Sequence, residues 1–262
     1  MPDAGSTTVA PLLAISDLSV RFGGIVALND VSFEVGRGQI CGLIGPNGAG
    51  KTTLFNCLSR LYQPDTGRIT FDGHALLQQP RYRMAALGIG RTFQNLALFR
   101  TMTVRDNIMV GGHCRGQSGF VANALRLPNV AREEQLLAER ARELIDVLDL
   151  GSVADTEVQS LTFGVQKRVE LARALACGPK LLLLDEPAGG LNHEEVERLR
   201  ALIASLRDRF DLTILLVEHH MNLVMRVSDK VVALDFGRKI ADGKPAEVQN
   251  APEVIRAYLG AA

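Results

Sequence analysis

The sequence predicts an α/β fold with a mainly parallel sheet, an N-terminal antiparallel β subdomain and an inserted α-helical subdomain. Two short, uninterrupted apolar runs, Leu181–Leu184 and Thr213–Val217, are typical of central parallel strands covered on both faces. Segments 12–23 and 30–35 instead alternate apolar and polar residues, as half-buried strands do. The stretch from about residue 96 to residue 160 has few strand signals, which indicates the helical insertion.

The bulk properties fit one globular domain. The chain has 262 residues, of which 47% are hydrophobic and 22% charged, as is usual for a protein with a substantial core. Lysine plus arginine and aspartate plus glutamate both number 29, so no overall field attracts nucleic acid. No apolar run approaches the ~20 residues that span a bilayer, and the N-terminus lacks the pattern of a secretion signal. We expect a flexible tail over 1–11 and a single domain over 12–262, with the helical subdomain inserted at about 95–165.

The other elements follow in chain order. Segment 38–45 reads as a continuously apolar strand, and segment 67–73 as a further strand. The segment 230–243 is typical of a hairpin, and a short helix follows it. The four cysteines are far apart in the sequence and form no C-x-x-C pair, so a disulfide framework and a metal site are both unexpected.

Helices are predicted from apolar stripes at helical spacing. One stripe lies at 54, 58 and 61, and a second lies on the amphipathic segment 133–150. The segment GGHCRGQSG at 111–119 is expected to be a flexible loop. The third and longest stripe consists of Val196, Leu199, Leu202, Ile203 and Leu206.

A glycine-rich segment predicts a phosphate site. GPNGAGKTT matches the pattern G-x-x-x-x-G-K-[ST] directly after a strand and at the start of a helix, which is the context of a P-loop NTPase core. Glycines let the backbone approach an anion, and the N–H groups of the turn then point at phosphates. Lys51 would reach the β- and γ-phosphates, and Thr52 would offer its hydroxyl to Mg²⁺. The alternative is a chance glycine-rich turn. The predicted cradle comprises Gly45, Pro46, Asn47, Gly48, Ala49, Gly50, Lys51, Thr52 and Thr53.

Acidic and histidine side chains follow the two apolar strands. Asp185 and Glu186 end the first strand, where ligands of parallel sheets bind. Asp185 would hold Mg²⁺ and Glu186 would take a proton from the attacking water; the alternative is a solvated carboxylate pair. His219 follows the second strand and would contact the γ-phosphate, although such a histidine is usually surface or core. The spacing leaves open whether His219 or His220 faces the site.

The order of these motifs resembles that of the ATP-binding subunits of ABC transporters, from Leu12 to Gly260. The stretches RTFQN, LTFGVQKRVELARAL, LLLLDEPAGGLN and VEHHM carry the resemblance. The stretches RFGGIVALNDVSFEV, GRTFQNLALF, DEPAGGLNHEE and VEHHMNLVMRVSD are most similar to the branched-chain amino-acid importer subgroup. The resemblance implies ATP and Mg²⁺, separate membrane permease subunits, and a second ATP-binding subunit that is a related chain or a second copy. It also implies an external binding protein, no nucleic acid, and a peripheral position at the cytoplasmic face of the inner membrane.

The resemblance also gives the stretch LTFGVQ a role, because in the family this stretch completes the ATP site of the partner subunit. Thr162 and Gly164 would contact the γ-phosphate at a helix N-terminus. The usual pattern is Leu-Ser-Gly-Gly-Gln, so Phe163 and Val165 depart from it, and Gln166 lies one place later. The alternative for Thr162 is an ordinary helix cap.

Further roles come from the resemblance alone. Phe22 would stack on adenine, although core is the alternative, and Gln94 would touch Mg²⁺ or water on a loop that moves with the permease. Asn192 stands where the family usually has an aspartate in the loop that contacts the partner subunit, with the alternative of an N-cap for the following helix, and His220 is given no role. Leu96, Leu98 and Phe99 could form an apolar groove for a permease helix, with buried core as the alternative.

Three rival functions remain. They are a transporter subunit for another cargo such as urea, small amides or lipid, a soluble ABC-type ATPase, and a small kinase.

Overall fold

The computed structural model describes residues 10–94, 96–115 and 128–259, and these form two compact units. Unit 1 combines the chain up to Arg81 with the chain from Glu197 onward, and unit 2 runs from Tyr82 to Val196. Of the predicted tail at 1–11, only residues 10 and 11 lie within the described residues. The predicted single domain with an insertion at about 95–165 stays a prediction.

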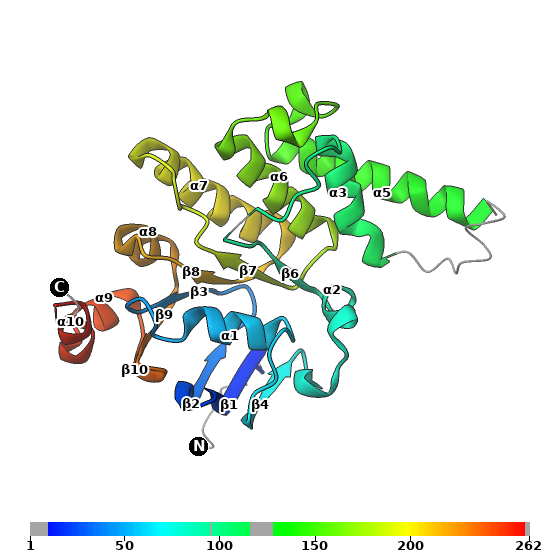
Figure 1. Cartoon of the computed structure of the whole chain (residues 1–262). Helices are drawn as coiled ribbons and strands as arrows, with labels where there is room; N and C mark the ends of the chain where they lie inside the picture. The colour runs from blue at the N-terminus through cyan, green and yellow to red at the C-terminus, as the bar shows by residue number, and fades with distance from the viewer. Residues whose placement is uncertain (1–9, 95, 116–127, 260–262) are drawn as a thin grey trace, which may run out of the picture. The chain divides into compact units, whose positions relative to one another are not determined.

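Unit 1 contains an antiparallel sheet in the order β2-β1-β4-β5, as the sequence predicts (Figure 1). Its second strand begins at Ile25 rather than at residue 30, because the Gly23–Gly24 turn lets it pair back at once, with Phe22 opposite Ile25. Its strands are β1 (Leu13–Phe22), β2 (Ile25–Val35), β4 (Thr66–Phe71) and β5 (His74–Ala75).

The second sheet of unit 1 places β3 between β8 and β9, parallel to both. β10 pairs antiparallel with β9, which confirms the predicted hairpin. All five residues of β3 and of β8 are buried. These strands are β3 (Ile40–Ile44), β8 (Thr213–Val217), β9 (Lys230–Asp235) and β10 (Arg238–Gly243).

The helices of unit 1 follow the strands. The predicted first stripe is wrong at Leu61, because α1 ends at Leu58 and Arg60 takes a positive φ of 57°, which leaves Leu61 exposed. A 3₁₀ turn covers Leu76–Gln78, and another covers Arg81–Arg83 at the boundary. The helices are α1 (Lys51–Leu58), α7 (His193–Phe210, whose first turn belongs to unit 2), α8 (Met221–Val227), α9 (Pro245–Gln249) and α10 (Pro252–Leu259).

Unit 2 contains a parallel strand pair and a helical cluster in which α3, α5 and α6 pack on one another (Figure 1). Short 3₁₀ turns lie at His113–Arg115, Gly151–Val153 and Val158–Ser160. The amphipathic helix begins at Pro128, before the predicted residue 133. The elements are α2 (Met84–Leu87), β6 (Ile89–Arg91), α3 (Val104–Gly112), α5 (Pro128–Val147), α6 (Phe163–Ala176) and β7 (Leu181–Asp185).

The predicted loop at 111–119 is wrong at its start. α3 continues through Gly112. Gly111 lies so close to α6 that a Cβ there would overlap the carbonyl oxygen of Arg173. The two glycines therefore allow close helix packing rather than a loop. The end of that segment lies outside the described residues.

Two of the four free cysteines, Cys114 and Cys177, meet in unit 2 despite their separation in the sequence. Their hydrogen bond lowers the pKa of Cys114 to about 7 and raises that of Cys177.

Within the described ranges, no helix is both long enough and apolar enough to cross a bilayer.

A buried asparagine closes the turn that leads into α3. Asn107 is fully buried; its Oδ1 accepts the Phe99 N–H at 2.9 Å and its Nδ2 donates to the Phe99 carbonyl at 3.0 Å. We expect Asn107→Ala to lower the free energy of unfolding by about 2–4 kcal/mol, because it leaves polar main-chain groups without partners. Urea unfolding measures this change. Arg105→Ala, which removes an exposed ion pair with Asp155, is the control and should change stability far less; equal effects would contradict the assignment.

Candidate functional site

The predicted phosphate cradle forms a tight loop between β3 and α1 in unit 1. Gly45 has a φ of +151° and Gly50 a φ of +102°. A Cβ at Gly45 would overlap the Leu234 carbonyl oxygen, and one at Gly50 would lie 2.6 Å from the Ala27 carbonyl oxygen. Only glycine therefore fits these two positions. No side chain caps α1 at Gly50, so the first-turn N–H groups can serve an external anion.

Lys51 is bound to its own loop. Its side chain is buried, and Nζ donates to the carbonyl oxygens of Gly45 at 2.6 Å and Pro46 at 2.9 Å. These two hydrogen bonds hold the Lys51 ammonium beside the N-terminus of α1. The ammonium and the helix N-terminus both attract phosphate. Thr52 is exposed in the first turn, as a hydroxyl that binds an external cation must be. Asn47 and Gly48 are exposed, Ala49 is buried, and Pro46 and Thr53 are intermediate.

Phe22 lies at the end of β1 with 45% of its surface exposed, so the alternative of plain core is wrong. Its ring meets Tyr62 edge to face, with centroids 5.1 Å apart. Tyr62 is also exposed, and sequence reasoning missed it because no motif contains it. The pair offers an aromatic surface suited to a flat heterocycle.

The histidines after β8 are organised by a buried carboxylate. Glu218 is 1% exposed and accepts hydrogen bonds from the backbone N–H groups of His219 at 2.9 Å and His220 at 3.2 Å. The ring Nδ1 of His220 lies 3.1 Å from the same carboxylate oxygen. This contact engages His220 structurally, in agreement with its lack of a predicted role. The predicted role of His219 stays a prediction.

In unit 2, β7 ends with the two predicted carboxylates in different environments. Asp185 is buried and its Oδ2 lies 3.0 Å from Arg91 Nη2, and its backbone N–H donates to the Thr92 hydroxyl at 3.2 Å. Glu186 takes a φ of +49°, a left-handed conformation that is uncommon for a residue with a Cβ. The chain therefore leaves the extended strand conformation at Glu186, directly after β7.

Gln94 and Glu186, both predicted site residues, contact each other. Gln94 Nε2 donates to Glu186 Oε2 at 2.7 Å. The segment around Gln94 is held by Glu170 of α6, whose Oε1 accepts the N–H groups of Phe93 at 3.1 Å and Ala97 at 3.4 Å. Burial raises the pKa of the Glu170 carboxyl. Sequence reasoning missed Glu170. The only signal was a glutamate between two apolar residues, Val169 and Leu171, of the predicted helix.

The segment after Gln94 is partly exposed. Leu96 and Leu98 are intermediate and Phe99 is half-exposed, with the Arg173 guanidinium 5.9 Å from its ring centroid. The predicted groove for a permease helix stays a prediction.

The tip of α6 carries the predicted partner-facing residues. Thr162 occupies the N-cap position but makes no side-chain capping bond, so the ordinary-cap alternative is wrong. Gly164 lies in the first turn. Phe163 is half-exposed, with Lys167 Nζ 5.3 Å from its ring centroid. Gln166 donates to the main-chain carbonyls of Val158 at 3.1 Å and Leu161 at 2.9 Å, so its amide serves the local turn.

Lys167 and Asn192 fix the chain on either side of the loop after β7. Lys167 Nζ donates to the Glu186 carbonyl at 3.0 Å. Asn192 and Glu195 exchange hydrogen bonds of 3.0 and 2.8 Å, which is a capping box for α7 and confirms the predicted N-cap.

The predicted site residues therefore form two sets. Unit 1 holds the cradle, Phe22 and His219, and unit 2 holds Gln94, Asp185, Glu186, Thr162 and Gly164. Besides Tyr62, sequence reasoning missed the polar groups that position these residues, namely Arg91, Lys167, Glu170 and Glu218.

Comparisons with known proteins agree with the geometry. A family model described as "ABC transporter" matches residues 28–189, and one described as "Branched-chain amino acid ATP-binding cassette transporter" matches residues 238–262. The high-affinity branched-chain amino acid transport ATP-binding protein BraF of Pseudomonas aeruginosa is 43% identical over 96% of this chain and 99% of its own length. LivG of Escherichia coli strain K12, with the same functional description, is 42% identical with the same coverage.

Solved structures give the same result. A nucleotide-free ATP-binding cassette from an ABC transporter matches with a TM-score of 0.81 and 28% identity, over 95% of this chain and 99% of that one. The ADP conformation of an ATP-binding cassette of an ABC transporter also matches with a TM-score of 0.81 and 28% identity, over 96% of this chain and 100% of that one.

The raised pKa of Glu170 predicts a specific pH dependence. Burial disfavours its carboxylate, and Lys167 and Arg173 offset this only in part. The folded state therefore binds the proton more readily than the unfolded state, so stability falls as pH rises from the ordinary pKa through the raised one. Relative to Glu170→Gln, the unaltered chain should therefore be less stable at pH 8 than at pH 4.5, the ordinary pKa of a glutamate carboxyl. Urea unfolding at both pH values tests this. Glu134→Gln, an exposed site on α5, should give no pH-dependent difference, and parallel profiles for Glu170→Gln would contradict the prediction.

Proposed function

We propose that this chain powers uptake of branched-chain or related amino acids through a separate membrane permease. The premise is that the chain belongs to the ABC transporter family, as one of its ATP-hydrolysing subunits. The observation that carries the proposal is the hydrogen bond between Gln94 and Glu186. It connects the proposed catalytic base to the loop proposed to move with the permease.

The proposed chemistry begins at the cradle. Lys51 and the first-turn N–H groups of α1 bind the phosphates, and Phe22 stacks on the adenine. Glu186 takes the proton from the attacking water, while His219 and Gln94 orient that water. When Mg²⁺ is bound, it would neutralise phosphate charge, and Thr52, Gln94 and Asp185 would be its oxygen ligands.

The donor set suits Mg²⁺, which prefers oxygen ligands. Thr52 presents an exposed hydroxyl. Asp185 uses one carboxylate oxygen for Arg91, and a carboxylate has acceptor sites beyond a single hydrogen bond. The Gln94 amide donates through nitrogen to Glu186, so its oxygen can face a cation.

Two subunits, this chain with a related chain or a second copy, close over ATP. Thr162 and Gly164 then meet the γ-phosphate held by the partner. The uncapped Thr162 hydroxyl and the α6 N-terminus support this role, because both complement negative charge. The working complex lies peripherally at the cytoplasmic face of the inner membrane, with permease subunits and, indirectly, an external binding protein.

The cargo proposal rests on the relatives. BraF and LivG are described as high-affinity branched-chain amino acid transport ATP-binding proteins, and the C-terminal match carries the same description.

Glu186→Gln tests the proposed base. The amide keeps the shape of the side chain but cannot accept the proton, so we expect ATP hydrolysis to fall roughly 10²–10⁴-fold while ATP binding is retained. Phosphate release and fluorescent-nucleotide titration measure the two quantities. Glu134→Gln should hydrolyse ATP normally, and near-normal turnover by Glu186→Gln would show that another group is the base.

Uptake in cells lacking this chain tests the cargo. We expect the unaltered chain to restore uptake of radiolabelled leucine, and Glu186→Gln to fail, because transport requires hydrolysis. Restored uptake of urea or a small amide, but not leucine, would overturn the cargo proposal and leave the ATPase role intact.

A further inference from the structure

The C-terminal helix α10 contacts the phosphate loop at its first residue. The Gly45 backbone N–H donates to the Tyr258 hydroxyl oxygen at 2.9 Å, across a separation of 213 residues. The Gly45 carbonyl accepts from Lys51 Nζ at 2.6 Å. Both polar groups of Gly45 are therefore engaged by side chains, one from the C-terminal helix and one from the lysine proposed to bind phosphate.

The position of the Tyr258 hydroxyl is set by packing. Val254, one turn earlier on α10, is 2% exposed and belongs to a core cluster that includes Ile44, the residue before Gly45. The Tyr258 ring packs against the same cluster. Burial raises the pKa of the Tyr258 hydroxyl, so it stays neutral at physiological pH. The helix that carries the hydroxyl and the strand that carries the loop thus share one rigid support.

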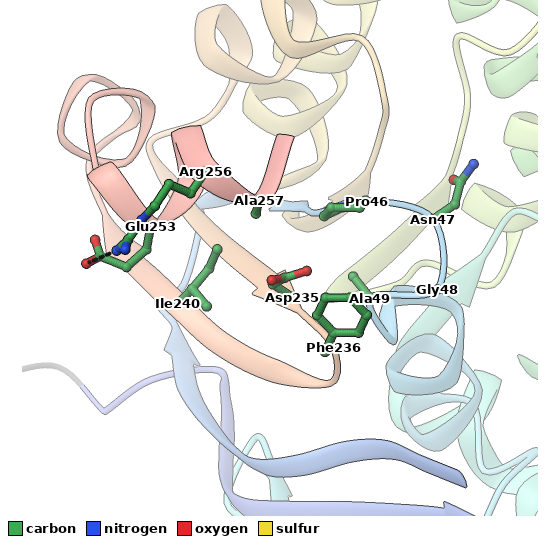
Figure 2. Close-up of a pocket in the computed structure, with 10 residues that line it drawn as sticks. All are labelled: Pro46, Asn47, Gly48, Ala49, Asp235, Phe236, Ile240, Glu253, Arg256 and Ala257. Carbon is green, nitrogen blue, oxygen red and sulfur yellow. Dashed lines mark hydrogen bonds and ion pairs between the residues drawn. The ribbon is translucent and has the colours of Figure 1, made fainter. Parts of the chain in front are cut away.

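The phosphate loop also borders a pocket. Residues Pro46 to Ala49 line one side of this pocket, which has a volume of about 490 Å³ (Figure 2). Glu253, Arg256 and Ala257 of α10 line another side. A second main-chain contact comes from the β9–β10 turn, where the Gly237 N–H donates to the Ala49 carbonyl at 3.1 Å. On this side two directed hydrogen bonds hold the loop, one at Gly45 and one at Ala49.

We propose that Tyr258 is a positioning residue, whose hydroxyl fixes the start of the phosphate loop and thereby pre-organises the cradle for the phosphates of the nucleotide. Pre-organisation raises affinity by removing the cost of ordering the loop on binding. Lys51 bonds to the Gly45 carbonyl, so a displaced Gly45 also displaces the ammonium. The proposal rests on the proposed role of the cradle, and it is independent of the cargo.

Tyr258→Phe tests the proposal, because it removes only the hydroxyl and keeps the packed ring. We expect the Kd values for fluorescent ATP and ADP analogues to rise about three- to tenfold, the range that the loss of one hydrogen bond gives. The KM for ATP should rise similarly, while kcat at saturating ATP stays within about twofold. Amide hydrogen exchange in residues 45–50 should accelerate without nucleotide, which is a readout independent of hydrolysis.

Two controls separate positioning from general stability. Ile69→Ala, at a buried position of β4 in the antiparallel sheet, should lower the unfolding temperature while leaving the KM for ATP and exchange at residues 45–50 unchanged below that temperature. Glu253→Gln, which alters an exposed pair with Arg256, should change neither quantity. Unchanged KM and exchange in Tyr258→Phe, or equal changes in Ile69→Ala, would overturn the proposal. If leucine uptake fails while Tyr258→Phe raises the KM and accelerates exchange as expected, only the cargo proposal is overturned.

Discussion

The hydrogen bond from Gln94 to Glu186 is the interaction on which the chemistry of unit 2 depends. It is maintained from one helix. Glu170 of α6 binds the main chain on both sides of Gln94, and Lys167 of α6 binds the carbonyl of Glu186. Thr162, the residue proposed to contact the partner's nucleotide, is the N-cap of the same helix. A displacement of α6 would therefore reach Glu186, Gln94 and Thr162 together, because close-packed interiors transmit strain.

Each half of the proposed chemistry uses a lysine to hold main-chain oxygens. Lys51 binds the carbonyls of its own loop in unit 1, and Lys167 binds the carbonyl of Glu186, directly after β7, in unit 2. An ammonium group suits this task because it offers three donors and no acceptor. Glu170 is the acidic counterpart, since it binds N–H groups.

The sequence was sufficient for the fold and for the motif residues, and insufficient for the groups that support them. The apolar runs of β7 and β8, the cradle and the hairpin could be recognised because each is a local pattern. Arg91, Glu170 and Tyr258 could not, because their partners are distant in sequence and because Glu170 and Tyr258 bind backbone atoms. The left-handed conformation of Glu186 was equally hidden, since a non-glycine residue takes it only when the surrounding structure compels it.

The close approach of α3 to α6 at Gly111 has an evolutionary consequence. The hydrogen on its Cα faces the Arg173 carbonyl, and even one methyl group would collide with the peptide backbone there. A side chain can yield by choosing another rotamer, but a helical backbone cannot. In a saturation library selected for growth, codon 111 should therefore tolerate no amino acid but the original, whereas codon 151, whose glycine faces open space, should accept most replacements.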